Sequence, residues 1–409
     1  MKRLLMVAYH FPPLAGSSGI QRTLRFVQEL PRFGWQALVL SVHPRAYERT
    51  SHDLNEAVPA GTLVRRAFAL DTARHLSIRG RYAGALARPD RWVSWKFDGV
   101  RQGLDLIRQE QPDAIWSTYP IATAHLIGAE LHRRSGLPWV ADFRDPMAQD
   151  GYPTDPVVWQ HYKAIESQAA QAAALCTFTT PSATRTYQER YPHAADRMLL
   201  LENGYDEDSF AKSEAETPVR EPLNRDGVTL LHSGIVYPAE RDPTQLFDAL
   251  AMLKRNGRLG ERRLRIRFRA AVHDELLNKL AAERQVQELV EIMPPVPYAE
   301  ALGEMLRADG LLVMQAENCN EQVPAKIYEY MRAGRPIVCL SSPEGDTCRV
   351  LRDAGVADGA RLDSAPEIAD FLARVVMKDT RQLMPSPEAV ARASRQSRAQ
   401  QLATALASL

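Results

Sequence analysis

Residues 310–340 read GLLVMQAENCNEQVPAKIYEYMRAGRPIVCL, and this stretch decides the fold class. Its first part, Gly310–Gln315, is a continuous apolar run of the length expected for a strand buried on both faces. A polar loop follows, then a helix that opens at Lys326, and then a second apolar run at Pro336–Leu340. Because parallel strands need a crossover connection, usually a helix, the stretch predicts a parallel sheet flanked by helices.

The same alternation of short apolar runs and amphipathic stretches continues along the rest of the chain. Earlier in the second half, the sequence predicts strands at Val228–His232, Leu264–Ala270 and Val290–Met293, with helices at Thr244–Arg255, Glu275–Arg284 and Tyr298–Leu306. The first half predicts strands at Lys2–Tyr9, Gln36–Ser41, Ala114–Ser117, Trp139–Asp142 and Leu175–Thr180, with a helix at Gln21–Phe33. The sequence therefore predicts two α/β units of similar size.

The junction between the two units is predicted near residue 205. The segment Asp206–Asp226 is rich in Glu, Asp, Pro and Ser, which is typical of a linker and surface loop. We expect Rossmann-like domains at 1–205 and 206–386, facing each other across a cleft, because open α/β sheets bind ligands at the carboxyl ends of their strands. An amphipathic helix over 387–409 is assigned to the first domain.

Composition narrows the class of protein. Of the 409 residues, 45% are hydrophobic and 25% are charged, as in ordinary globular enzymes, and the formal net charge of +1 gives no reason to expect a nucleic-acid partner. The four cysteines form no CxxC pair, which argues against a zinc site and favours a reducing compartment. The apolar run Leu4–Tyr9 is too short for a signal peptide, and we expect a cytoplasmic protein, with the cytoplasmic membrane face as an alternative location.

The first candidate site is the loop His10–Gly19, which leads from the first predicted strand into a helix. A loop of this kind offers free N–H groups and the positive end of a helix dipole to a phosphate, and Gly16 and Gly19 leave room for a ligand. The GxGxxG fingerprint of dinucleotide-binding proteins is missing, which argues against NAD. The alternative is a plain turn between a strand and a helix.

The second candidate is the pair Glu321 and Glu329, which flank Lys326. Carboxylates accept hydrogen bonds from neighbouring hydroxyl groups, and sugars and ribose present such hydroxyls in pairs. The alternative is that Glu321 lies on a solvated loop and Glu329 on an ordinary surface helix. Two glutamates at a given spacing are common, so the spacing alone does not indicate a site.

Together with its flanking residues, this stretch resembles the retaining glycosyltransferases of family 4, which have the two-domain GT-B fold. The resemblance rests on Glu321-x7-Glu329 followed by Ala333-Gly334-Arg335-Pro336, and PAKIYEYMRAGRPI is most similar to bacterial members that build surface polysaccharides. It implies that Glu321 contacts the donor sugar and Glu329 the ribose. It also implies retention of the anomeric configuration.

The resemblance extends to Leu231–Pro243, where the family binds the donor diphosphate through a glycine and basic residues. Gly234 and Arg241 occupy those places. The Arg–Lys pair that is usual in the family is missing, because this stretch contains no lysine and Ile235 follows Gly234. We therefore expect the donor to be held by Arg241 with help from Lys326. The alternative for Arg241 is a surface salt bridge with Glu240 or Asp242.

In the first half, polar residues follow two predicted strands at Ser117–His125 and in the stretch Ala-Asp-Phe-Arg-Asp-Pro that ends at Pro146. We place Thr118, Tyr119 and Asp145 on the acceptor side. Asp142 is the candidate group near the acceptor hydroxyl, which makes Glu321, Asp142 and Arg241 the predicted catalytic residues. For Asp142, a helix cap or a partner for Arg144 is the alternative.

A basic stretch between Arg74 and Arg91 is followed by Trp92 and Trp95. Arginines beside tryptophans suit a membrane surface or an anionic lipid-linked acceptor. A solvated basic loop is the alternative.

These observations predict a hexosyl-transferring glycosyltransferase of bacterial surface polysaccharide synthesis. We expect it to use a nucleotide diphosphate sugar, with UDP-sugar favoured, and a glycan or lipid-linked acceptor. No cofactor and no metal ion are expected, because arginine and backbone N–H groups can neutralise the phosphates. The alternatives are a non-catalytic nucleotide-sugar-binding protein and another GT-B enzyme, such as an epimerase or a phosphorylase.

Overall fold

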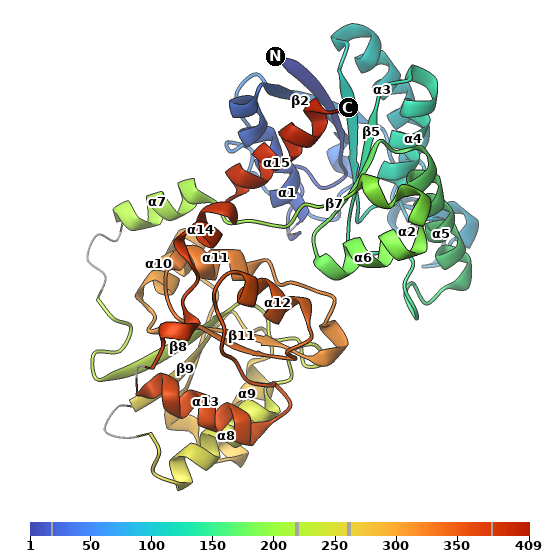
Figure 1. The fold of residues 1–409 in the computed structure, drawn as a ribbon. Coiled ribbons are helices and arrows are strands. Elements are labelled where there is room, and N and C mark those ends of the chain that lie inside the picture. Colours follow the sequence, from blue (N-terminus) through green and yellow to red (C-terminus); the bar gives the residue numbers. More distant parts are fainter. Residues whose placement is uncertain (18, 217–220, 260–262, 378) are drawn as a thin grey trace. The chain divides into compact units, whose positions relative to one another are not determined.

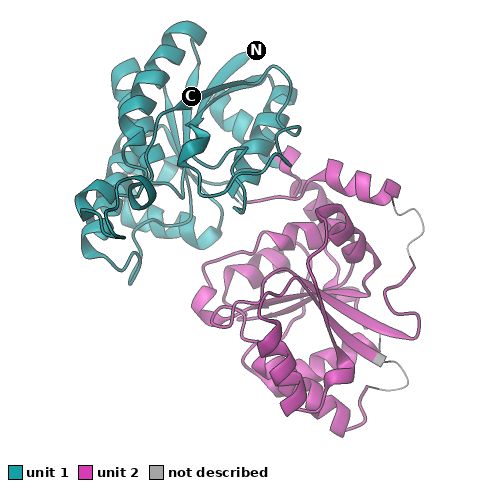
Figure 2. Ribbon diagram, turned by 180° about the vertical axis from the view of Figure 1, so that it is seen from behind, with its two compact units in different colours: residues 1–202, 398–409 teal, residues 203–397 magenta. Residues whose placement is uncertain are grey.

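The computed structural model describes residues 1–409 except 18, 217–220, 260–262 and 378. The chain divides into two compact units (Figure 2). Unit 1 contains Met1–Glu202 and Arg398–Leu409, and unit 2 contains Asn203–Ser397. The division falls within the stretch Glu202-Asn-Gly-Tyr-Asp206 that leads to the predicted linker.

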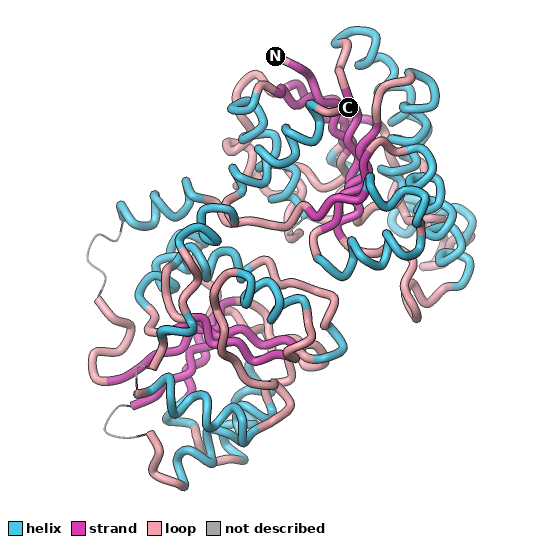
Figure 3. The backbone as a smooth tube through the Cα atoms, in the orientation of Figure 1, coloured by secondary structure: helices cyan, strands magenta, loops and turns pink. Residues whose placement is uncertain are grey.

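Within the described residues, unit 1 is built on a sheet of seven parallel strands in the order β3-β2-β1-β4-β5-β6-β7 (Figure 3). Their bounds are β1 Lys2–Val7, β2 Trp35–Val42, β3 Leu63–Ala67, β4 Ala114–Thr118, β5 Trp139–Arg144, β6 Leu175–Phe178 and β7 Met198–Leu200. The central strands β1, β4 and β5 are buried along most of their length, as expected for a parallel sheet with helices on both faces.

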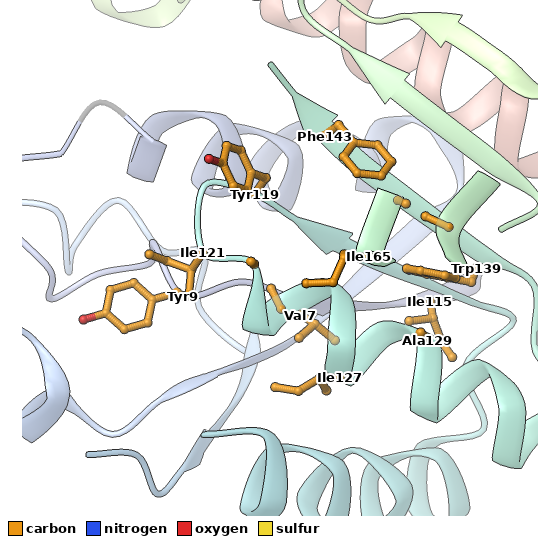
Figure 4. Packing of buried hydrophobic residues seen from close by; sticks show 14 of the residues in the cluster. Val7, Tyr9, Ile115, Tyr119, Ile121, Ile127, Ala129, Trp139, Phe143 and Ile165 are labelled. Carbon is orange, nitrogen blue, oxygen red and sulfur yellow. The ribbon is translucent and has the colours of Figure 1, made fainter. Parts of the chain in front are cut away.

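The two faces of this sheet belong to two apolar clusters, as the alternation of side chains along a strand requires. Leu5 and Val7 of β1 point into the larger cluster, where Figure 4 shows Val7 near Ile127, and Ile115 beside Trp139. Leu4 and Met6 point to the opposite face. The helices of unit 1 are α1 Gly19–Glu29, α2 Thr72–His75, α3 Trp95–Glu110, α4 Thr123–Ser135, α5 Pro156–Ala172, α6 Pro181–Arg190 and the part of α15 (Arg395–Ala407) from Arg398 onward.

The chain end differs from the predicted single helix over 387–409. It forms α14 (Pro387–Arg392), which belongs to unit 2, and α15, which packs through Leu402 and Leu406 into the same cluster as Leu24 of α1 (Figure 1). The helix is interrupted because the backbone around residue 394 pairs with Tyr205. The N–H of Tyr205 donates to Ala393 O at 3.1 Å, and the N–H of Arg395 donates to Tyr205 O at 2.8 Å.

Unit 2 contains, within its described part, a parallel sheet in the order β10-β9-β8-β11-β12. The strands are β8 Gly227–Ser233, β9 Arg263–Arg269, β10 Val290–Met293, β11 Gly310–Gln315 and β12 Ile337–Ser341. The helices are α7 Glu207–Glu216, α8 Thr244–Arg255, α9 Asp274–Glu283, α10 Tyr298–Arg307, α11 Lys326–Ala333, α12 Asp346–Asp353, α13 Ala365–Val376 and α14.

Helix α7 corrects the prediction that Asp206–Asp226 is a linker and surface loop. Phe210 of this helix is completely buried in unit 2, and Arg332 of α11 pairs with Glu207 at 2.5 Å and with Glu214 at 3.3 Å. The acidic residues that suggested a loop therefore neutralise an arginine of the same unit. Residues 217–220 of the predicted linker lie outside the described part of the chain.

Both sheets reverse their winding next to their first strand. In unit 1 the chain runs from β1 outward to β2 and β3 and then returns to the other side of β1 with β4, and in unit 2 β8 and β11 are related in the same way. Loops that leave neighbouring strands at such a switch point diverge, which opens a crevice at the carboxyl edge of the sheet. The loops after β1 and β4, and those after β8 and β11, are therefore where we expect ligands.

Candidate functional site

The loop after β8 carries Gly234 and Arg241. Gly234 has φ +106°, a conformation that favours glycine, and a Cβ at this position would lie 3.2 Å from Lys326 Nζ. Arg241 donates from Nη1 to Ile235 O at 2.8 Å, and its guanidinium lies over the ring of Tyr237, 5.1 Å from its centroid. These contacts hold the guanidinium close to the end of β8.

The alternative of a surface salt bridge for Arg241 is wrong. In the part of the chain that the structure describes, neither Glu240 nor Asp242 pairs with it, and its Nε is buried without a partner. Asp242 instead accepts from the N–H and the hydroxyl of Thr244, at 2.9 and 2.6 Å, where α8 begins. A guanidinium that the protein leaves without a carboxylate is free to bind an anion.

Lys326, in the first turn of α11, brings a second cation to the same place. Its Nζ lies 3.2 Å from Nε2 of His232, a completely buried residue of β8. Burial lowers the pKa of Lys326 to about 7, and repulsion from Arg241 acts in the same direction. Two cations that repel each other in this way are typical of a site for a phosphate group.

Glu329 lies on α11, one turn after Lys326. It accepts a hydrogen bond of 2.6 Å from the hydroxyl of Tyr298, the first residue of α10. Burial raises the pKa of the Glu329 carboxyl, although the Tyr298 hydroxyl acts in the opposite direction. The carboxylate has further lone pairs, so it can accept from hydroxyl groups of a ligand at the same time.

Glu321 lies on the loop between β11 and α11, and its side chain is exposed. The backbone on each side of it is fixed by the start of α12. The N–H of Asp346 donates to Asn320 O at 2.7 Å, and the hydroxyl of Thr347 donates to Gln322 O at 3.0 Å. An exposed carboxylate on an anchored loop is suited to accept from hydroxyls of a ligand.

In unit 1 the glycine-bearing loop leads into α1. Gly16 has φ +78°, and Gly19 begins the helix. A Cβ at Gly19 would lie 2.3 Å from His10 Nδ1 and 2.8 Å from Arg144 Nη1, so only glycine fits between these two side chains. Ser18, between the two glycines, lies outside the described residues.

Asp142 is placed differently from its predicted position near an acceptor hydroxyl. Its side chain is completely buried and pairs with Arg22 of α1, which donates to the two carboxylate oxygens at 3.0 and 2.7 Å. Thr177 and Thr118 donate to it at 2.6 and 2.7 Å. Burial opposes ionisation, but these four bonds outweigh it and lower the pKa. The geometry gives Asp142 a structural role, with Arg22 instead of Arg144 as its partner.

The three predicted acceptor-side residues have different environments. The hydroxyl of Thr118 donates to Asp142 and is buried with it. Tyr119 is only 6% exposed and packs edge-on against Tyr162. Asp145 is exposed and accepts from the Thr179 hydroxyl at 3.3 Å. Of the three, only Asp145 presents its side chain to solvent.

Three residues that contribute to these sites were missed by the sequence analysis: His232, Tyr298 and Arg22. His232 had a signal, because a histidine in an otherwise apolar strand, two residues before a strand-end glycine, calls for a polar partner. Tyr298 and Arg22 stand at polar positions of helices and carry no such signal.

The basic stretch between Arg74 and Arg91 forms more internal contacts than predicted. Arg91 pairs with Asp71 and Glu48, Arg88 pairs with Asp155, and the Arg74 guanidinium donates to Tyr47 O. Trp95 is completely buried and Trp92 packs against the core, so neither tryptophan is free to enter a membrane. Arg79 and Arg81 remain exposed.

The described residues lack two features, a membrane-spanning helix and a cluster of metal ligands. No helix in that part of the chain is both long and apolar enough to span a membrane. The same residues also contain no group of three or more His, Cys, Asp or Glu side chains that could hold a metal ion.

Comparisons with known proteins agree with this architecture. The Anabaena protein Alr3699/HepE, solved in complex with UDP, is 15% identical and superposes with a TM-score of 0.67 over 100% of both chains. Sucrose-phosphate synthase from Thermosynechococcus elongatus is 15% identical, with a TM-score of 0.65 over 99% of this chain and 98% of its own. Trehalose 6-phosphate synthase from Burkholderia multivorans is 13% identical, with a TM-score of 0.66 over 100% of this chain and 97% of its own. At such identities the similarity shows the fold.

The family is indicated by the sequence of unit 1. Residues 18–204 match the family model of the glycosyl transferase 4-like domain. No curated protein sequence matches the chain significantly. Residues 18–204 are therefore similar to a glycosyl transferase 4-like domain, and the chain as a whole has the two-domain fold of these solved structures.

Proposed function

We propose that this protein is a glycosyltransferase that transfers a hexosyl group from a UDP-sugar to a glycan or lipid-linked acceptor, with retention of configuration, in bacterial surface polysaccharide synthesis. The observation that carries the donor part is the pair of cations, Arg241 and Lys326, beside Gly234 at the switch point of unit 2. The UDP complexes of Anabaena HepE support uridine as the base. Retention and the polysaccharide role are supported by the resemblance of Glu321–Pro336 to family 4.

In this proposal the donor binds to unit 2. Arg241 and Lys326 bind the diphosphate, Glu329 accepts from the ribose hydroxyls, and Glu321 accepts from the sugar. Charge develops on the diphosphate as the bond to the sugar breaks, and cations already in place stabilise that charge without reorganisation. Because two cations can carry it, no metal ion is required. Loss of transfer on adding EDTA, with recovery on adding manganese, would contradict this part of the proposal.

The experiment that tests the donor site is a thermal-shift screen against UDP, GDP, ADP, dTDP and CMP without metal. A ligand at ~100 times its dissociation constant adds about 2.7 kcal/mol to the stability of the folded state, which is readily measured. We expect UDP to raise the melting temperature more than the other nucleotides. A larger shift with another diphosphate would overturn the choice of uridine, and no shift with any of them would overturn the donor site.

For the acceptor we propose a lipid-linked molecule that the enzyme meets at the membrane surface. The support is a segment of unit 1, residues 68–97, that exposes six large apolar side chains beside Arg79 and Arg81: Phe68, Leu76, Ile78, Tyr82, Leu86 and Phe97. Ile78 is 79% exposed and Phe97 is 80% exposed. Exposed apolar groups together with arginines suit anionic bilayers.

Sedimentation with vesicles tests whether residues 68–97 bind the membrane. We expect the protein to bind vesicles that contain phosphatidylglycerol, and the double variant Ile78→Ser/Phe97→Ser to bind them at least about fivefold more weakly. Met377→Ser is the matched control, because Met377 is 77% exposed but lies in unit 2. Equal vesicle binding by all three proteins would contradict the proposal that residues 68–97 bind the membrane. It would leave the proposed donor site unaffected.

A further inference from the structure

His232 is an unusual residue for the interior of a parallel sheet. It lies in β8 with no exposed surface, and both ring nitrogens have partners. Nδ1 lies 3.0 Å from Leu312 O of β11, and Nε2 lies 3.2 Å from Lys326 Nζ of α11. One imidazole therefore connects the two strands of the switch point to the helix that carries the cation.

The 3.0 Å contact with Leu312 O favours one tautomer of the ring, and the backbone of Ile235 also faces the imidazole. A carbonyl oxygen only accepts, so Nδ1 carries the proton and donates it to Leu312 O. Nε2 then holds a lone pair, which accepts from the amino group of Lys326. Burial lowers the pKa of His232 well below its usual value, and Lys326 adds to the effect, so the ring stays neutral and keeps this lone pair.

We propose that His232 is the residue that positions Lys326, holding its ammonium against Gly234 to face the diphosphate of the bound nucleotide sugar. The inference rests on the proposed donor function of unit 2 and adds a residue to it. Gly234 is part of the arrangement, because a Cβ there would stand 3.2 Å from Nζ. The stretch Leu231–Pro243 contains Arg241 but no lysine, so a second cation has to come from another element.

The charges around Lys326 predict how this arrangement responds to pH. His232 faces it from β8, Arg241 from the loop after β8, and Glu329 from the same helix, where its carboxylate favours the ammonium. In the empty site the pKa of Lys326 is about 7, so the ammonium is half deprotonated at neutral pH. A bound diphosphate favours the ammonium and raises the pKa. Binding above pH 7 therefore takes up a proton, and affinity falls as the pH rises.

The test is a titration of the full chain with UDP-glucose and with uridine between pH 6 and pH 9. The diphosphate of UDP-glucose is a diester and does not itself titrate in this range. For the unaltered protein we expect the affinity for UDP-glucose to fall by up to about tenfold per pH unit above pH 7. We expect the affinity for uridine, which has no phosphate, to be constant.

Variants of His232 and Lys326 show whether His232 positions the lysine or only fills space in the core. His232→Phe keeps a ring of similar size without the lone pair, and it should weaken UDP-glucose binding at pH 6.5 at least about tenfold while uridine binds as before. His232→Gln, whose side-chain oxygen accepts in place of Nε2, should recover most of the loss. Lys326→Arg keeps a cation that does not titrate, and it should remove the pH dependence.

The outcomes are distinguishable. If His232→Phe weakens both ligands equally, or neither, His232 does not act through Lys326 and the inference is wrong. A constant UDP-glucose affinity in the unaltered protein would also overturn it, and this result does not depend on whether a His232 variant folds. If neither UDP-glucose nor uridine binds the unaltered protein, the proposed donor function fails first.

Discussion

Each unit has a pair of charged residues near the carboxyl edge of its sheet. In unit 1, Asp142 and Arg22 have opposite charges, and hydroxyls of the same unit saturate the carboxylate. In unit 2, Arg241 and Lys326 have the same charge, and Arg241 leaves Nε without a partner in the described part of the chain. The difference teaches that a charge neutralised by the protein itself serves the fold, whereas one left uncompensated serves a ligand.

The largest effect is expected from breaking the pair in unit 1. Asp142→Ala leaves Arg22 buried without its carboxylate, and losing one partner of a buried pair costs about 3–5 kcal/mol of unfolding free energy. Urea unfolding of the full chain measures this loss. Because the pKa of Asp142 is lowered in the folded protein, its contribution should be present above pH 4 and disappear as the pH falls further.

A double variant provides the control for that prediction. Arg22→Met with Asp142→Leu removes both charges, so it should be less destabilised than Asp142→Ala. A stable Asp142→Ala protein that has lost only sugar transfer would contradict the comparison, and would return Asp142 to the acceptor side as the sequence suggested.

A smaller effect, on binding alone, is expected from the cations of unit 2. Arg241→Ala should weaken UDP-glucose binding about 10–100-fold, because a charge-assisted contact to the diphosphate is lost, and it should hardly change the melting temperature. Arg255→Ala is the matched control, since Arg255 is an exposed arginine at the opposite end of α8. If Arg241→Ala destabilises the protein and spares UDP-glucose binding, Arg241 belongs to the fold after all.

The architecture could be predicted because its signals are local. The helix Thr244–Arg255 and the strand Val290–Met293 lie where the apolar pattern places them. The pattern failed for β3, Leu63–Ala67, because this edge strand includes two arginines and is half-buried. It also failed for β7, which spans only Met198–Leu200. Short or half-buried edge strands lack the continuous apolar run by which the central strands are found.

The site could be predicted only in part, because its partners are distant in the sequence. A polar residue after an apolar strand indicates the carboxyl edge of the sheet, and Asp142 and Arg241 are both found there. Whether such a charge is compensated depends on a side chain that no spacing rule reveals. Arg22 is 120 residues away from Asp142, and Tyr298 is 31 residues away from Glu329.

The carboxylate of Glu329 is partly satisfied by the protein, through Tyr298, and is therefore intermediate between the neutralised Asp142 and the uncompensated Arg241. Removing the tyrosine hydroxyl should have the smallest effect of the changes considered. Glu329 has one hydroxyl partner at 2.6 Å and further lone pairs for the two hydroxyls of a ribose. Tyr298→Phe removes that partner but not the carboxylate, so UDP should bind only about twofold to fivefold more weakly. Glu329→Ala removes the acceptor itself, and the loss should be about tenfold.

Comparing UDP with its 2′-deoxy analogue shows where that loss arises. If Glu329 accepts from the ribose, the unaltered protein should prefer UDP, and Glu329→Ala should bind the two nucleotides nearly equally. Tyr298→Phe should keep the preference, because the carboxylate can still accept from the ribose. If Glu329→Ala keeps the full preference for UDP, the tyrosine alone satisfies the carboxylate. In that case Glu329 has a structural role, like Asp142, and does not bind the ribose.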